Sequence, residues 1–185
     1  MALSVPAALA ASFDNADSPH TTASFKPTDG RVVIAAYASS SDVVTAVSLA
    51  GGGVTTWTQF ATVAHGTGTN QRKIWLFRAY QAAYGGAAPA TFTTTGVGTS
   101  GAWIIFEIYG ADTSGTNGAG AIVQSPTNTG TTETTATVTM SAFGDATNNG
   151  AFGCVDRRSN AAITEEAGYT EIGEQSATAP GHTLE

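Results

Sequence analysis

The chain has 185 residues, a net charge of −7 and a charged fraction of only 11%, well below the roughly 25% of an ordinary soluble domain. Because a negative surface repels phosphate backbones, this balance argues against nucleic-acid binding. No segment approaches the roughly 20 apolar residues that a membrane-spanning helix needs, so membrane insertion is not expected. The acidic residues gather after residue 158, where no Lys or Arg follows, and we interpret them as a solvated surface.

A chain of this length can bury a core of its own as one domain. We expect an N-terminal arm or first strand within residues 1–30, with 7–13 as the strand candidate, and a single β-sandwich domain over residues 31–185. The one cysteine, Cys154, permits no intrachain disulfide. Because it lies in the apolar run 151–155, we expect it to be a small buried core residue.

Short strands separated by turn residues are predicted along the first half of the chain, almost without helical signals. The first strong candidate (RVVIAAYA) follows an Asp-Gly turn, and three consecutive glycines at 51–53 indicate backbone angles that only glycine adopts easily. The predicted strands in this half are residues 31–38, 43–49, 54–63, 71–80, 90–95 and 102–109.

Two of these candidates are apolar on both faces. In residues 71–80, Ile74 and Leu76 point one way and Trp75 and Phe77 the other. Such a strand lies either beneath a covering loop, which we favour, or at a subunit interface. In residues 102–109 the predicted core face holds Ala102, Ile104, Phe106 and Ile108, and the opposite face holds Trp103, Ile105, Glu107 and Tyr109.

The second half of the chain holds the clearest alternation of apolar and polar residues. In residues 134–140, Ala136, Val138 and Met140 are expected to face inward and the intervening threonines outward. Residues 151–155 follow an Asn-Gly turn, and 168–174 form a last, short exposed strand. The whole pattern predicts an all-β fold, a two-sheet antiparallel β-sandwich of jelly-roll type, with an immunoglobulin-like order as the alternative.

The histidines and a glycine motif carry little chemistry. His20, His65 and His182 lie far apart in polar stretches, so we interpret them as exposed loop residues and not as metal ligands. Residues 96–101 match G-x-G-x-x-G, but no helix follows to hold a pyrophosphate. We therefore expect a hairpin loop there and no nucleotide site.

Oxygen-bearing side chains cluster in two places, and either cluster resembles a partial calcium loop. Turn formation explains them more simply, because Asp and Asn bond their own backbone. The two clusters are Asp14, Asn15 and Asp17, and Asp112 with Asn117.

Glu107 interrupts an apolar strand and is either a catalytic carboxylate in a groove or, as we favour, a residue that faces solvent or pairs with Arg78 or Arg72. Glycoside hydrolysis needs a second carboxylate, and none can be named. Six aromatic residues could line a sugar-binding surface, although core packing is favoured: Trp57, Trp75, Trp103, Tyr37, Tyr80 and Tyr109. No catalytic, cofactor-binding or metal-binding residue is predicted, ligand-binding residues stay unassigned, and no enzymatic activity is expected.

Three motifs occur in order along the chain: GVTTWT at 53–58, EIYGADT at 107–113 and GYTEIGE at 168–174. In these motifs, over about residues 31–174, the chain resembles β-sandwich modules of phage virion proteins and bacterial surface proteins. The resemblance implies a structural or adhesive role and supplies no catalytic residues. Such modules usually close with a further apolar strand after the last motif. We therefore expect a sandwich that lacks this edge, that a neighbouring chain completes, or whose sequence is cut short.

The resulting functional prediction is a non-enzymatic structural protein of a phage particle, in head decoration, fibre or tail. Its expected partners are other copies of itself and other virion proteins, and an uncovered strand edge would serve as the contact. The alternative is a carbohydrate-binding module or adhesin that recognises host-surface glycans, on a virion or as an extracellular or bacterial surface protein. A glycan-cleaving enzyme ranks third.

Overall fold

The computed structural model describes residues 4, 7–39, 44–66, 71–96, 98–130, 135–144, 148–178 and 181–185. Within these residues regular structure is almost entirely strand, with one 3₁₀ turn, η2 (Ala119–Ala121). The strands are β1 (Ala10–Asp14), β2 (His20–Thr21), β3 (Val32–Ser39), β4 (Ala46–Gly51), β5 (Thr58–His65), β6 (Arg72–Tyr80), β7 (Ala90–Thr95), β8 (Gly101–Ile108), β9 (Asp156–Arg157), β10 (Gln175–Thr178) and β11 (Gly181–Leu184). No helix among the described residues is long and apolar enough to cross a membrane.

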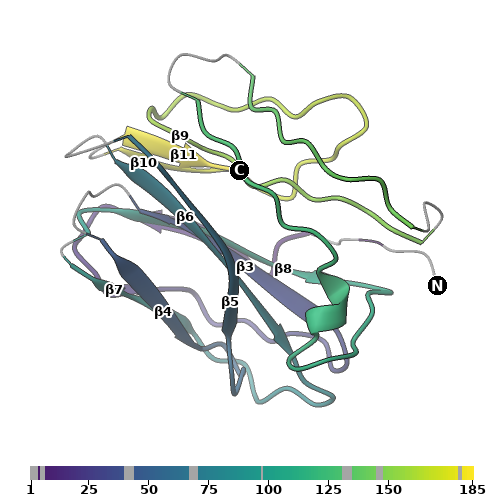
Figure 1. Ribbon diagram of the computed structural model, residues 1–185. Helices are drawn as coiled ribbons and strands as arrows, with labels where there is room; N and C mark the ends of the chain where they lie inside the picture. The colour runs from purple at the N-terminus through teal and green to yellow at the C-terminus, as the bar shows by residue number, and fades with distance from the viewer. Residues whose placement is uncertain are drawn as a thin grey trace.

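Two antiparallel sheets form the sandwich, one in the order β1-β8-β3-β6-β5 and the other β2-β7-β4 (Figure 1). The pairing is nested: β1 pairs with β8, β2 with β7 and β3 with β6. This nesting is the jelly-roll arrangement. The predicted all-β sandwich of jelly-roll type is confirmed, and the immunoglobulin-like order is not the one observed. Strand β5 remains beside β6 and does not join β4, which makes the sheets unequal.

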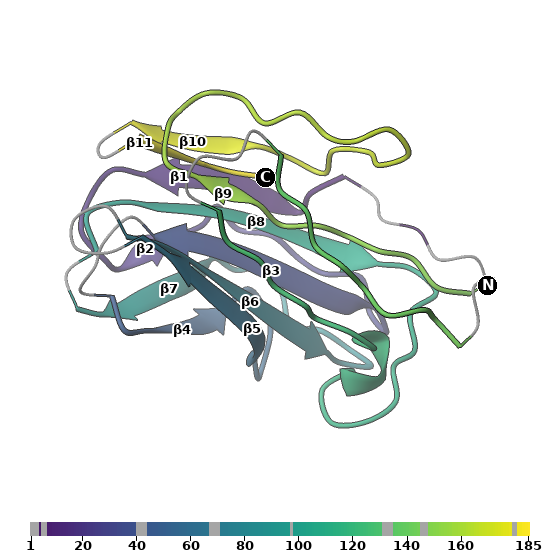
Figure 2. The same ribbon diagram turned by 45° about the horizontal axis from the view of Figure 1, so that its top comes forward.

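A third layer lies on the outer face of the larger sheet (Figures 1 and 2). It consists of the small sheet β10-β11-β9 and of the described parts of residues 122–174, a mostly irregular stretch that includes β9 and that we call the covering segment. The two predicted sheets are therefore joined by a third layer, of which the sequence indicated only a loop covering residues 71–80. This layer explains why the central strands can be apolar on both faces.

The molecule accordingly has two cores, one on each face of the larger sheet. The inner core lies between the sheets and includes Trp75, Phe77, Trp103 and Ile105. The outer core includes Ile104, Phe106, Ile74 and Leu184, with side chains of the covering segment packed over it. Strand β3 is buried along its whole length, because three of its residues are alanines that let both layers approach closely. The two-faced assignments for β6 and β8 are confirmed, as is the favoured covering of β6.

The glycine run between β4 and β5 makes the turn that the sequence predicted. Gly51, Gly52 and Gly53 have φ of +87°, +73° and +70°, the left-handed region that other residues rarely adopt. A Cβ on Gly52 would lie 2.4 Å from Cζ of Phe25. The turn uses the residues up to Val54, so β5 begins at Thr58 and not at residue 54. Strand β4 begins at Ala46, and residue 43 lies outside the described residues.

Three predicted strands of the second half are wrong where the structure describes them. Residues 135–140 form no strand and are exposed, with Val138 and Met140 48% and 36% exposed; residue 134 is not described. Residues 151–155 and 168–174 also form no strand. A period-two pattern shows that a segment suits a sheet, but pairing also needs a neighbouring strand. Among the described residues of these segments, Val155 alone exchanges backbone hydrogen bonds with another segment, at Glu185.

Two strands that the sequence analysis missed follow the GYTEIGE motif, the hairpin β10–β11. Leu184 of β11 is fully buried, and the backbones of Val155 and Glu185 exchange hydrogen bonds of 2.8 and 2.9 Å. At four residues each, these strands are too short for alternation to reveal them.

Candidate functional site

The two sheets leave a groove of about 260 Å³ where their edge strands β1 and β2 face each other. Its lining combines aromatic, hydroxyl and carboxylate groups. Phe13 is 41% exposed at this site, whereas Trp103 is almost fully buried. The groove is lined by Ala10, Ala11, Ser12, Phe13, Asp14, Thr21, Ala23 and Trp103. Its hydroxyl and carboxylate groups offer hydrogen bonds to a small polar ligand.

His20 lies beside this groove and is fully buried on β2, so its expected place in an exposed loop is wrong. Its ring lies 5.8 Å from that of Tyr37 and 6.3 Å from that of Trp103, centroid to centroid. Its Nδ1 lies 3.5 Å from Oδ2 of Asp14. Burial lowers the pKa of His20, and Asp14 only partly opposes that shift. A histidine that stays neutral among aromatic rings acts here as a core residue.

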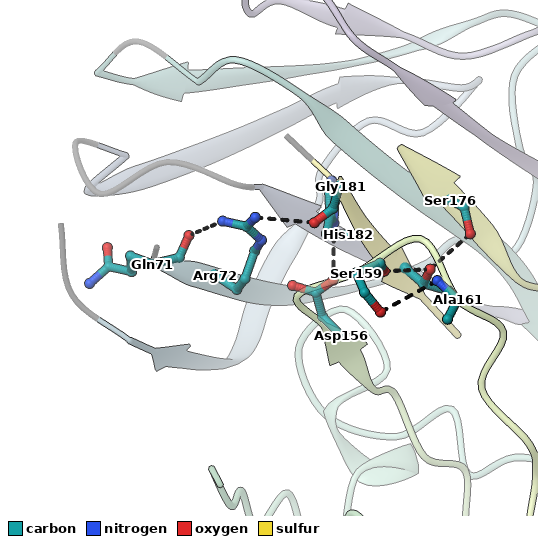
Figure 3. A network of polar contacts seen from close by, with 9 residues as sticks. Gln71, Arg72, Asp156, Ser159, Ala161, Ser176, Gly181 and His182 are labelled. Carbon is teal, nitrogen blue, oxygen red and sulfur yellow. Dashed lines mark hydrogen bonds and ion pairs between the residues drawn. The ribbon is translucent and has the colours of Figure 1, made fainter. Parts of the chain in front are cut away.

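His182 is also fully buried, again contrary to the expected exposed loop. Its Nδ1 lies 3.0 Å from Oδ1 of Asp156, which ties β11 to β9 (Figure 3). Burial raises the pKa of Asp156, and the hydrogen bond to His182 opposes that rise. Beside this pair Arg72 donates to the carbonyls of Gln71 and Gly181 at 2.8 and 3.2 Å.

A His–Asp pair suggests a hydrolytic triad, but the neighbouring hydroxyls are used otherwise. Ser176 and Thr183 share a hydrogen bond of 2.8 Å, and Thr183 donates to the carbonyl of Ser159 (Figure 3). Nε2 of His182 has no hydrogen-bond partner among the described residues, whereas a triad needs it to accept the proton of a nucleophile. The pair joins two strands within the third layer, and the hydrogen bond from Arg72 of β6 to Gly181 connects that layer to the larger sheet.

Glu107 is buried at 3% exposure, so the favoured solvent-facing position is wrong. Its carboxylate accepts hydrogen bonds from the Thr28 amide at 2.8 Å, the Thr28 hydroxyl at 2.9 Å and the Tyr109 hydroxyl at 2.8 Å. In the described part of the chain no ion pair joins it to Arg72 or Arg78. All its contacts therefore brace the loop before β3 against β8.

The six aromatic residues divide between core and partial exposure. Tyr37, Trp75 and Trp103 are buried in the inner core, as favoured from the sequence. The other three, Trp57, Tyr80 and Tyr109, are half-buried. Trp57 donates to the carbonyl of Gly51 at 3.1 Å, and the Arg31 guanidinium lies 4.0 Å from the Tyr109 ring centroid. The aromatic group the sequence analysis passed over is Phe13, which lines the groove.

Both oxygen clusters form turns, which was the favoured interpretation. Asp14 accepts the amide of Ala16 at 2.9 Å, and Asp112 accepts the amide of Ser114 at 2.8 Å. Asn117, at φ 54°, accepts the amide of Tyr80 at 2.8 Å and donates to the carbonyls of Thr56 and Arg78. In the part of the chain that the structure describes, no group of three or more His, Cys, Asp or Glu could hold a metal ion.

Cys154 and the glycine motif have structural positions. Cys154 packs against the outer core, and burial raises the pKa of its thiol, which keeps it unreactive. The glycine motif at 96–101 leads from β7 into β8, which lie in different sheets. It is therefore a crossover and not the expected hairpin loop, with Val97 outside the described residues.

The covering segment presents the most unusual surface of the molecule. Val123 is 66%, Val138 48% and Tyr169 52% exposed. Two of its runs lie side by side and are joined by side-chain amides: Gln124 bonds both backbone groups of Ser141, and Asn128 donates to the carbonyl of Thr137. Extended chain held without a backbone ladder is open to further pairing.

Comparison of the chain with protein-family models, with curated proteins and with solved structures found no match.

Proposed function

We propose that this protein is a non-enzymatic structural protein of a phage particle, in head decoration, fibre or tail. It would act by packing against copies of itself and against other virion proteins. The observation that carries the proposal is the first part of the covering segment, where the described runs 122–130 and 135–144 contain no charged residue and leave Val123 and Val138 exposed. Isolated chain of this kind gains stability when another subunit covers it.

Two further observations support this role. The polar side chains that suggested chemistry, Glu107 and His182, are buried and bond neighbouring segments of the fold, Glu107 the loop at Thr28 and His182 the adjacent strand β9. The jelly roll is an architecture of viral capsid domains and also of lectins, which is an argument from fold and not from a site. The three motifs that resemble virion and surface modules agree with either use.

The test is the composition of purified particles. Phage particles induced from the strain that carries the gene would be banded by density and analysed by quantitative mass spectrometry. We expect this protein in a fixed ratio to the main capsid or tail protein, and antibody labelling in electron micrographs would then place it on head or tail. Its complete absence from the particles would overturn the proposal.

A second candidate function is glycan binding in the groove between β1 and β2. The observation that favours it is the lining of the groove, where Phe13 of β1 exposes an aromatic ring and the alternate residues Ser12 and Asp14 supply a hydroxyl and a carboxylate from the opposite face of the strand. Sugar rings stack on such faces while carboxylates and hydroxyls bond their hydroxyl groups.

A glycan array probed with the purified protein tests this candidate. We expect binding that Phe13→Ala abolishes and that Tyr169→Ala, at an exposed aromatic residue of the covering segment, leaves intact. Loss of binding in both variants, or no binding by the unaltered protein, would count against the groove.

A further inference from the structure

We infer that residues 135–141 form a pairing edge for a second copy of this chain, which adds antiparallel about a two-fold axis at Val138. The inference rests on the proposed structural role and names its partner.

The first step is the geometry of the two joined runs. The Gln124 side chain donates to the Ser141 carbonyl at 2.9 Å and accepts the Ser141 amide at 2.8 Å. The Asn128 side chain donates to the Thr137 carbonyl at 2.7 Å. From Gln124 to Asn128 the first run advances by four residues, while the bonded residue on the second run moves back by four, from Ser141 to Thr137. The two runs are therefore antiparallel and extended. Side-chain amides occupy the space where a backbone ladder would form.

The second step identifies the free edge. Backbone groups of alternate residues in an extended chain point to opposite edges. Those of Thr137 and Ser141 face the neighbouring run, so those of Ala136, Val138 and Met140 face away from it. The backbones of these three residues have no hydrogen bond within the described part of the chain, and their side chains are exposed.

The third step is the symmetry of the sequence T-A-T-V-T-M-S at 135–141. Antiparallel to itself about Val138, it places Val138 opposite Val138 and Ala136 opposite Met140, a small side chain against a large one. On the other face Thr137 opposes Thr139 and Thr135 opposes Ser141, so hydroxyl groups meet hydroxyl groups. Such cross-strand pairs stabilise a sheet, and this match selects a copy of the same segment as the partner.

The fourth step is charge. The chain carries a net charge of −7, so two copies repel each other over most orientations. The described runs 113–130 and 135–144 contain no charged residue, whereas Glu165, Glu166 and Glu171 are exposed further along the covering segment. The pairing edge is thus a neutral surface at which two acidic copies can meet.

Cross-linking tests the register directly. In a Cys154→Ser background, Val138→Cys places one thiol opposite its own copy at the axis, within the Cα separation that a disulfide spans. Met140→Cys opposes Ala136, so its thiols in the two copies lie several residues apart. Under mild oxidation we expect a covalent dimer from Val138→Cys and none from Met140→Cys. Equal yields from both variants, or no dimer from either, would overturn the inference.

Sedimentation velocity at micromolar concentration provides the second measurement. Val138→Lys brings two ammonium groups together at the axis, and Val123→Lys makes the same change at another exposed valine. We expect the dimer dissociation constant to rise at least about tenfold in Val138→Lys and to stay unchanged in Val123→Lys. Circular dichroism checks that both fold. An equal effect of both changes would contradict the inference.

The outcomes separate the inference from the proposed function. A protein that is present in particles but fails to cross-link at residue 138 retains its structural role and loses this edge. A protein that cross-links at residue 138 but is absent from particles retains the edge and loses the virion role.

Discussion

Individual polar side chains with little exposure act in this protein as braces between loops and strands. Glu107 links the loop at Thr28 to β8 and Tyr109. Asn117, in the loop just before η2, accepts the amide of Tyr80 at the end of β6. In both cases one side chain satisfies several backbone or hydroxyl groups that would otherwise be buried without partners.

Glu107→Gln should lower the free energy of unfolding by about 1–3 kcal/mol, because an amide can no longer accept all three donors. Urea unfolding followed by tryptophan fluorescence measures the change. The matched control is Glu166→Gln at an exposed glutamate, expected to change stability by less than about 0.5 kcal/mol. Equal stability of the two variants would show that the brace contributes nothing.

His20 should make stability depend on pH. Its pKa is lowered in the folded protein, so the unfolded chain takes up the proton first. Its contribution to stability is present above about pH 6.5 and is lost as pH falls toward the folded pKa. His20→Phe should flatten the decline in unfolding free energy between pH 7 and 5.5, by at most about 1.4 kcal/mol per pH unit.

His65 supplies the control for this measurement, since it is a half-buried histidine on β5. His65→Phe should retain the decline. If both variants keep the same pH slope as the unaltered protein, His20 is not the group responsible.

At the scale of elements, strands that pair along both edges could be predicted from the sequence, and the third layer could not. Strands β3, β6 and β8 have apolar residues on both faces. This pattern can be recognised from the sequence of each strand alone, without knowing which strands lie beside it. The alternation at 134–140 is just as regular, but whether it pairs depends on an available edge. Sequence alternation reports fitness for a sheet and not the presence of a partner.

The candidate sites were less predictable than the strands. His20 and His182 lie in polar stretches of sequence, yet segments distant in the sequence bury both side chains. A local sequence pattern carries no information about burial of this kind. Phe13 belongs to a short strand, and it lines the groove only because β1 and β2 are edges of different sheets. Turn chemistry is local, so the roles of Asp14 and Asp112 could be read correctly from the sequence.

The third layer should open when its buried anchor is removed. Leu184→Ala is expected to lower the unfolding free energy by about 2–5 kcal/mol, because Leu184 is fully buried in the outer core. The Cys154 thiol, which packs against the same core, should then react faster with a thiol reagent such as DTNB. Val123→Ala is the control at an exposed residue. Unchanged labelling in Leu184→Ala would mean that the layer is held elsewhere.

At the scale of the whole molecule, low charge and two cores suit a protein that works by contact. The larger sheet is buried on both faces, so its faces are not available to partners. Surfaces for contact remain at the strand edges and along the described runs 122–130 and 135–144 of the covering segment, which carry neutral hydroxyl and apolar side chains. The acidic charge lies toward the end of the sequence and limits how copies approach each other.

Self-association should therefore strengthen as the pH falls toward the sequence pI of about 4.7, because net charge and the repulsion between copies fall together. Sedimentation velocity at pH 7 and pH 5, at constant ionic strength, measures this. Added salt at pH 7 should act in the same direction by screening. Association that weakens at pH 5 would mean that attraction between unlike charges holds the copies together.

The nested pairing of the jelly roll also governs how the chain can fold. Among the described strands, only β5–β6 and β10–β11 pair neighbours in sequence. Strands β1, β2 and β3 pair with strands that come much later in the chain. Loop closure over such separations slows folding to the range of milliseconds to seconds or longer. A nascent chain that ends before β8 would have its first strand unpaired, so the middle of the sequence decides when the beginning can fold.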